Sequence, residues 1–202
     1  MFDYEASIDD NIALVDLDGT VADFDSEMKR RLEPLCGPGE PDYGDNYDDV
    51  PAYIKARRDL IKRQPGFWKG LPTIDRGFAV VSILRDVGFR LNVLTKCPKK
   101  NPRVWTEKVE WCVENLPDAQ LTLTEDKTGT YGKVLVDDYP PYFLAWLKVR
   151  PRGLVIAVAQ PWNKGVTHPN LIRYDGTNLP QVADAITRAH QRVGGQELSG
   201  NV

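Results

Sequence analysis

The segment that most constrains the fold is 12–18, where a continuous apolar run ends at two aspartates. A short apolar run without polar alternation is typical of a strand that is buried on both faces. Asp16 and Asp18 are separated by one leucine, and Gly19 allows the backbone to turn directly after them. The sequence therefore predicts two carboxylates at the carboxyl end of a buried strand, where open α/β sheets bind ligands.

An Asp-Gly pair between two apolar segments is also a β-hairpin signal, so these residues could form a simple turn. The following segment favours a helix, because its apolar side chains recur at intervals of three and four residues. They are Val21, Phe24, Met28 and Leu32. We therefore expect a strand, a tight turn and a helix.

Composition and charge exclude several functional classes. The chain has 202 residues, of which 42% are hydrophobic and 27% charged, which suits one domain with a small insertion. The net charge of -3 gives no general attraction to nucleic acid or to a membrane surface. We find no apolar run of membrane-spanning length, no secretion signal, and no cysteine spacing typical of a zinc site or a disulfide framework. We therefore expect a cytoplasmic protein.

Alternation of apolar and helical segments predicts an α/β fold. Short apolar segments at 90–95, 121–123, 133–138 and 153–159 alternate with helical patterns at 50–63, 75–88, 105–116, 142–147 and 182–193. This is typical of a Rossmann-like parallel sheet with helices on both faces. Right-handed crossovers bring the strand ends, and with them residues 160–165, to one edge. In the helix over 105–116 we expect Trp105, Val109, Cys112 and Leu116 to form the buried face.

A second apolar segment also ends in paired carboxylates, Asp137 and Asp138. Carboxylates gathered in one site repel each other unless a cation compensates, and oxygen ligands favour magnesium over zinc. The sequence therefore predicts a Mg²⁺ site formed by Asp16, Asp18, Asp137 and Asp138, in which Asp18 contributes its backbone carbonyl. The aspartates of 42–49 lack the ordered spacing of a calcium loop, so there we expect a solvated loop.

These residue types suit phosphoryl transfer. An aspartate can attack phosphorus and form an aspartyl-phosphate, a role we predict for Asp16. A second carboxyl with a raised pKa can protonate the departing oxygen, a role we predict for Asp18. Thr95 ends another predicted strand and Lys127 precedes the strand with the second acid pair, so both can bind phosphate oxygens.

In these segments the sequence resembles the haloacid dehalogenase-like phosphatases. Asp16-Leu17-Asp18-Gly19-Thr20, Thr95, Lys127 and Asp137-Asp138 match that family's four ordered motifs. The chain is most similar to the 5'(3')-deoxyribonucleotidases, through 18–24, 65–68, 123–128 and 134–138. The resemblance implies the roles predicted above, with Asp138 as the third metal ligand.

The resemblance also implies a cap and a nucleobase pocket. A small helical cap would be inserted after the first strand over 26–74, between core segments 1–25 and 75–202. The substrate-binding residues would be Phe24, Phe67, Trp68, Tyr43 and Lys96. Lys96 stands where members commonly carry serine, and its charge suits a more highly charged ester.

The expected function is Mg²⁺-dependent hydrolysis of (deoxy)nucleoside monophosphates. The alternatives are a phosphatase of another small ester such as a sugar phosphate, a polynucleotide 3'-phosphatase, and a non-enzymatic nucleotide-binding protein. We expect a small-molecule phosphate ester as the partner, and neither a membrane nor nucleic acid. A homodimer is left open.

Overall fold

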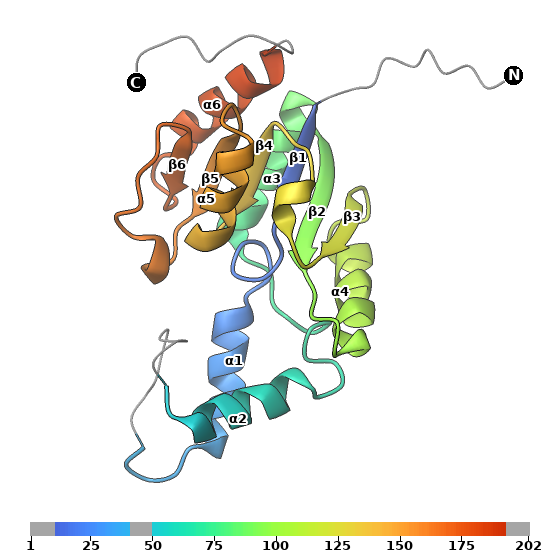
Figure 1. The fold of residues 1–202 in the computed structure, drawn as a ribbon, viewed down its shortest axis with the longest axis vertical. Coiled ribbons are helices and arrows are strands. Elements are labelled where there is room, and N and C mark those ends of the chain that lie inside the picture. The colour runs from blue at the N-terminus through green and yellow to red at the C-terminus, as the bar shows by residue number, and fades with distance from the viewer. Residues whose placement is uncertain (1–10, 41–49, 193–202) are drawn as a thin grey trace, which may run out of the picture.

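The centre of this computed structural model, which describes residues 11–40 and 50–192, is a six-stranded sheet (Figure 1). All neighbouring strands are parallel. The strands are β1 (Ile12–Val15), β2 (Arg90–Lys96), β3 (Gln120–Thr124), β4 (Val134–Asp137), β5 (Leu154–Val158) and β6 (Leu171–Tyr174). The spatial order β3-β2-β1-β4-β5-β6 confirms the predicted Rossmann-like sheet. The order reverses between β1 and β4, and open α/β sheets bind ligands at such a switch point.

Helices cover both faces of the sheet (Figure 1). They are α3 (Asp75–Val87), α4 (Pro102–Asn115), α5 (Pro140–Val149) and α6 (Leu179–Gln191). Successive side chains of a strand point to opposite faces. Ala13 and Val15 accordingly pack in one core cluster with residues of α3, α4 and α6, whereas Leu14 packs in a second cluster with Phe143 and Trp146 of α5. Two separate apolar layers therefore hold β1 in the middle of the molecule.

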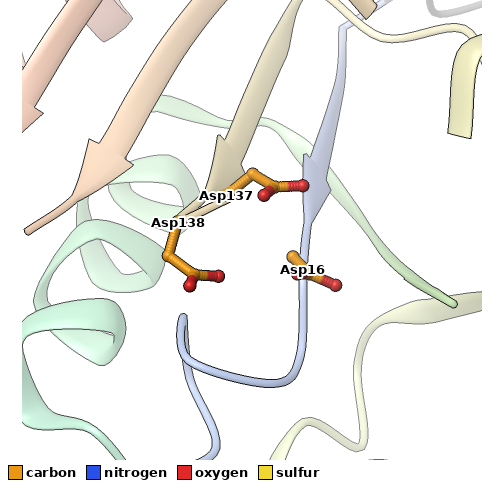
Figure 2. Close-up of side chains that lie close together, drawn as sticks. All are labelled: Asp16, Asp137 and Asp138. Atoms are coloured by element: carbon orange, nitrogen blue, oxygen red, sulfur yellow. The ribbon is translucent and has the colours of Figure 1, made fainter. Parts of the chain in front are cut away.

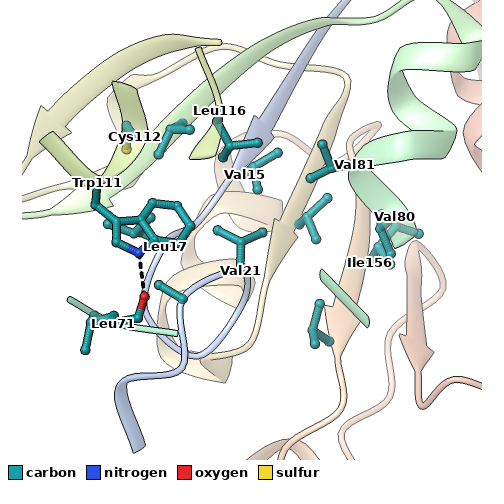
Figure 3. Close-up of a cluster of buried hydrophobic side chains, with 14 of the residues drawn as sticks. Val15, Leu17, Val21, Leu71, Val80, Val81, Trp111, Cys112, Leu116 and Ile156 are labelled. Carbon is teal, nitrogen blue, oxygen red and sulfur yellow. Dashed lines mark hydrogen bonds between the residues drawn. The ribbon is translucent and has the colours of Figure 1, made fainter. Parts of the chain in front are cut away.

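The larger core cluster also joins α4 to the chain that returns to the sheet (Figure 3). The indole Nε1 of Trp111 donates to the Leu71 carbonyl at 2.8 Å, within a layer that includes Leu17 and Val21 from the turn after β1. Burying the large ring while its N–H finds a partner avoids the cost of an unpaired polar group. The C-terminal half of α4 is thus fixed relative to the end of β1.

The helices between residues 24 and 74 project away from the sheet (Figure 1). They are α1 (Phe24–Leu32), the 3-10 turn η1 (Glu33–Leu35) and α2 (Ala52–Lys62). Asp23 caps α1 by accepting the Ser26 N–H at 3.0 Å. Helices α1 and α2 pack on each other. The division into a core and a cap with boundaries at 26 and 74 stays a prediction.

The predicted buried face of α4 is partly wrong. Val109 is 36% exposed and Trp105 is half-buried, whereas Val104, Lys108 and Trp111 are buried. The reason is that the buried face of this helix contains the charged residues Glu107 and Lys108. A search for apolar spacing therefore predicts the neighbouring face. The short edge strand β6 was not predicted either, since it carries an arginine and most of its residues are only half-buried.

Of the helices within the described ranges, none combines the length and the apolarity that crossing a bilayer requires.

Candidate active site

Gly19 shapes the turn that follows β1. Its φ is +74°, in the left-handed region that favours glycine. A Cβ atom at this position would lie 2.6 Å from Asp138 Oδ2. The glycine therefore allows the turn after β1 to approach the acid pair after β4.

Three buried carboxylates meet where β1 and β4 end (Figure 2). Asp16, Asp137 and Asp138 each offer an oxygen atom, and these atoms lie within 4.8 Å of one another. Burial and the neighbouring carboxylates raise the pKa of Asp137 and of Asp138. A hard divalent cation such as Mg²⁺ takes oxygen ligands of this kind and relieves the repulsion, so the donor set fits the predicted metal.

Lys127 lies beside this cluster in the 3-10 turn η2 (Lys127–Gly129). Its Nζ donates to Asp137 Oδ2 at 2.7 Å and pairs with Asp16 Oδ1 at 2.7 Å. Burial opposes the charged ammonium, but the two carboxylates raise the pKa of Lys127 overall. One buried cation faces three carboxylates, so the cluster keeps an excess of negative charge.

Asp138 is held by groups on both sides. Thr20 Oγ1 donates to its Oδ1 at 3.0 Å, and Trp162 Nε1 donates to its Oδ2 at 3.0 Å. Asn163 Nδ2 donates to the Asp138 carbonyl at 2.9 Å. Trp162 and Asn163 belong to η3 (Pro161–Asn163), and Gln160 Nε2 donates to the Gly19 carbonyl at 2.8 Å. The loop after β5 therefore borders the site, although we had predicted no individual role for these residues.

The predicted metal ligand of Asp18 is its backbone carbonyl, which stays a prediction, and its carboxylate has a partner of its own. Its side chain does not join the group of three carboxylates but pairs with Lys108, whose Nζ lies 2.5 Å from Asp18 Oδ2. Burial raises the pKa of the Asp18 carboxyl, and the Lys108 ammonium opposes that shift. No sequence motif predicted a role for Lys108. The sequence signal that could have identified it is its helical spacing from Val104 and Trp111, which puts Lys108 on the buried face of α4.

The predicted phosphate ligands lie near these acids. Thr95 is fully buried at the end of β2, and its Oγ1 accepts a hydrogen bond from Lys108 Nζ at 2.9 Å. The Nζ of the exposed Lys96 lies 4.7 Å from the ring centroid of Tyr142, and Lys127 Nζ lies 5.2 Å from the same ring. Tyr142 thus lies close to both of these cations.

The predicted aromatic residues form a cluster. The ring centroids of Phe24 and Trp68 are 5.3 Å apart, and Phe67 is 5.7 Å from Phe24 and 5.2 Å from Trp68. Phe67 is fully buried, and the Arg31 guanidinium lies 5.2 Å from its centroid. Phe24 is only half-buried, so it retains accessible surface. The predicted contact Tyr43 lies outside the described residues.

Comparison with known proteins identifies similar sequences in bacteria. A protein of Bordetella bronchiseptica, provisionally named 5'(3')-deoxyribonucleotidase, is 27% identical over 166 residues, which cover 77% of this chain and 87% of that protein. A protein of Bordetella pertussis with the same provisional name is 28% identical over 166 residues, with the same coverage of 77% and 87%. No protein-family model matches the chain. The sequence resemblance to deoxyribonucleotidases is confirmed.

A solved structure shares the fold. A protein of Lactobacillus delbrueckii, provisionally named phosphoglycolate phosphatase, gives a TM-score of 0.52 at 14% identity and covers 89% of this chain and 99% of its own. A hydrolase of the haloacid dehalogenase family from Entamoeba histolytica gives a TM-score of 0.49 at 9% identity, covering 90% and 100%. The predicted haloacid dehalogenase-like architecture is confirmed, and at these identities the likeness concerns the fold alone.

Proposed function

We propose that this chain, which has the haloacid dehalogenase-like fold and resembles proteins named as deoxyribonucleotidases, is a Mg²⁺-dependent phosphomonoester hydrolase of (deoxy)nucleoside monophosphates. The observation that carries the proposal is the position of Asp16. Its buried carboxylate lies at the carboxyl end of β1, next to Asp137 and Asp138 and 2.7 Å from the Lys127 ammonium. Asp16 thus lies, as a nucleophile, beside a site for a cation and beside the Lys127 ammonium, which can bind phosphate.

The first step transfers the phosphoryl group to Asp16. A carboxylate oxygen of Asp16 forms a bond to phosphorus while the ester P–O bond breaks, and the departing oxygen takes a proton from the Asp18 carboxyl. Asp18 suits this role because burial raises its pKa. The product of this step is a free nucleoside and an aspartyl-phosphate.

The second step releases phosphate. Water attacks phosphorus, its proton passes to the Asp18 carboxylate, and the bond between phosphorus and Asp16 breaks. Asp18 thereby regains the proton that it lost in the first step, and Asp16 regains its carboxylate. The enzyme is unchanged after one cycle, and one water molecule is consumed.

The other groups bind the phosphoryl group. Lys127 and Thr95 would contact its oxygens, where charge shifts during the transfer. Asp16 and Asp138, with Asp137 beside them, would hold Mg²⁺, which when bound would screen the repulsion between carboxylate and phosphate. This arrangement requires no other metal or organic cofactor.

Nucleotide specificity would come from the first residue of α1, Phe24, together with the helical segment 26–74. We assign the nucleobase contact to the half-buried Phe24, supported by Phe67 and Trp68 behind it, since a base can stack on an aromatic face. Lys96 would contact an additional negative charge of the ester. A cytoplasmic location and a small-molecule substrate remain parts of the proposal.

The proposal is tested with purified protein and a panel of phosphate esters. We expect phosphate release from nucleoside monophosphates in Mg²⁺, with loss of activity in EDTA and recovery after Mg²⁺ is restored. Asp16→Asn should lower kcat by at least ~10³-fold, because the amide is a poor nucleophile. The control Asp118→Asn, in an exposed pair with Arg85, should retain wild-type kcat.

Each other outcome has a defined meaning. Hydrolysis of sugar phosphates without hydrolysis of nucleotides would reject the nucleotide assignment and favour the alternative small ester. Inhibition by single-stranded oligonucleotide at low salt would favour a polynucleotide 3'-phosphatase. Nucleotide binding without phosphate release from any ester would reject an enzyme.

A further inference from the structure

Lys108 is a buried cation that lies outside all four sequence motifs. Its side chain is 1% exposed. Its Nζ donates to Asp18 Oδ2 at 2.5 Å, to Thr95 Oγ1 at 2.9 Å and to the Lys96 carbonyl at 3.0 Å. An ammonium has three N–H donors, so these contacts use all of them. Lys108 thus binds the proposed acid/base and a proposed phosphate ligand at the same time.

The Asp18 carboxylate depends on this contact for its orientation. Within 11–40 and 50–192, its Oδ1 is buried and has no hydrogen-bond partner. The bond from Lys108 to Oδ2 therefore fixes the rotation of the carboxylate. Hydrogen bonds in which one partner is ionised are shorter and stronger than neutral ones, which suits an anchor.

Lys108 is itself held on a fixed helix. Its neighbour Glu107 accepts the backbone N–H of Gly66 at 2.8 Å and that of Trp68 at 3.0 Å. Trp111, one turn further along α4, donates to a carbonyl of the same connecting segment (Figure 3). The Nζ of Lys108 lies 4.8 Å from the Trp68 ring centroid, a cation–π contact. The ammonium therefore has little freedom to move.

We propose that Lys108 is a positioning residue for the proposed phosphatase reaction. It holds the Asp18 carboxyl in the orientation that allows proton exchange with the leaving oxygen of the ester, and it ties that orientation to α4. The inference rests on the proposed function. General acid catalysis contributes ~10²–10⁴-fold to a rate, and it matters most when the leaving oxygen is strongly basic. The rate decrease caused by removing Lys108 should therefore depend on the basicity of the leaving oxygen.

The test compares two esters in the variant Lys108→Met. Thymidine 5'-monophosphate has an alkoxide leaving group that needs a proton, whereas 4-nitrophenyl phosphate has a leaving group that needs none. We expect kcat/KM to fall by ~10²-fold for the nucleotide and by less than about fivefold for the aryl ester. The parameter kcat/KM is chosen because it reports the phosphoryl transfer that precedes hydrolysis of the aspartyl-phosphate.

Two matched controls separate positioning from folding. Lys133→Met removes another buried lysine, 5% exposed, which binds Asn11 Oδ1 at 2.7 Å and the Arg192 carbonyl at 2.9 Å before β4 begins. Its effect should be equal for the two esters. In an Asp18→Asn background, Lys108→Met should cause no further leaving-group-dependent loss, because the group that it positions is gone.

Each result of the two-ester comparison either supports or overturns the positioning role of Lys108. Equal losses on both esters in Lys108→Met would overturn the positioning role, since a disturbed phosphate site or fold affects both. If that variant does not fold, Lys108→Arg serves instead: it keeps the charge and should show a smaller, still leaving-group-dependent loss, and equal losses would again overturn the role. If the wild-type protein hydrolyses another alkyl ester but no nucleotide, only the nucleotide assignment is rejected. The Lys108→Met comparison would then use that alkyl ester in place of the nucleotide. Wild-type protein that hydrolyses no ester would reject both proposals.

Discussion

Gly19→Ala is the substitution whose effect can be worked out most fully from the structure. An alanine at φ +74° occupies the left-handed region, which costs about 1–2 kcal/mol of folding free energy. Its Cβ would also lie 2.6 Å from Asp138 Oδ2 and 2.9 Å from Asp138 Cγ, closer than atoms approach in folded proteins. Asp138 is held by Thr20 and Trp162, so relief requires that its carboxylate leave both partners. We therefore expect a stability loss and a weaker metal site.

The matched control for this substitution is Gly39→Ala. Gly39 has φ +81°, and among residues 11–40 and 50–192 no atom beyond its chain neighbours lies within 4 Å of a Cβ built there. Both variants should thus lose about 1–2 kcal/mol of stability through backbone strain. Only Gly19→Ala should also raise the Mg²⁺ concentration for half-maximal activity, by ~10–100-fold, the range typical of disturbed support around a metal ligand.

The assay is phosphatase activity as a function of Mg²⁺ concentration, with thermal unfolding measured on the same samples. Added Mg²⁺ should raise the Tm of wild-type protein and of Gly39→Ala more than that of Gly19→Ala, because a bound ion stabilises the folded state. If Gly19→Ala shows the Mg²⁺ dependence of Gly39→Ala, the assignment of Asp138 to the metal site is wrong.

Three further predictions concern the surroundings of the site. Phe24→Leu should raise KM for nucleoside monophosphates several-fold but leave KM for ribose 5-phosphate unchanged; equal changes would contradict a nucleobase contact. Glu27, held by Arg30 and Arg31, has a lowered pKa, so its stabilising effect is present above the ordinary carboxyl pKa and is lost as pH falls through the folded-state value. Glu27→Gln should therefore lower Tm at pH 7, and the Tm difference from wild type should decrease as the pH is lowered. A Tm difference that is the same at all pH values would contradict a stabilising role of the ion pairs. Burial raises the pKa of Cys97, and that of Cys112 to about 12, so iodoacetamide at pH 8 should modify Cys36 alone in the folded protein, as mass spectrometry can check.

The strands and the acidic residues at their ends were predictable from sequence. Buried parallel strands need apolar side chains on both faces, so the runs before Asp16 and Asp137 stand out. Parallel topology then places those ends at one edge, whatever the lengths of the connections. The meeting of Asp16, Asp137 and Asp138 follows from these two facts.

Other features depend on tertiary contacts that no local pattern contains. Lys108 can be buried because Asp18 and Thr95 accept hydrogen bonds from its ammonium, and Asp18 lies 90 residues away in the sequence. The helix α1 begins at Phe24, later than its periodicity predicts, because the N–H groups of Val21 and Ala22 bond to the Leu17 carbonyl in the turn. Periodicity alone does not distinguish this turn from a first helical turn.

The most direct test of the account is to trap the phosphorylated protein. Acid quenching during turnover of a labelled ester in Mg²⁺, followed by peptide mapping, reports where the phosphoryl group is bound. We predict a hydroxylamine-sensitive phosphoryl group on Asp16 that is absent in Asp16→Asn. Turnover without any such adduct, or an adduct on another residue, would contradict the central role of Asp16.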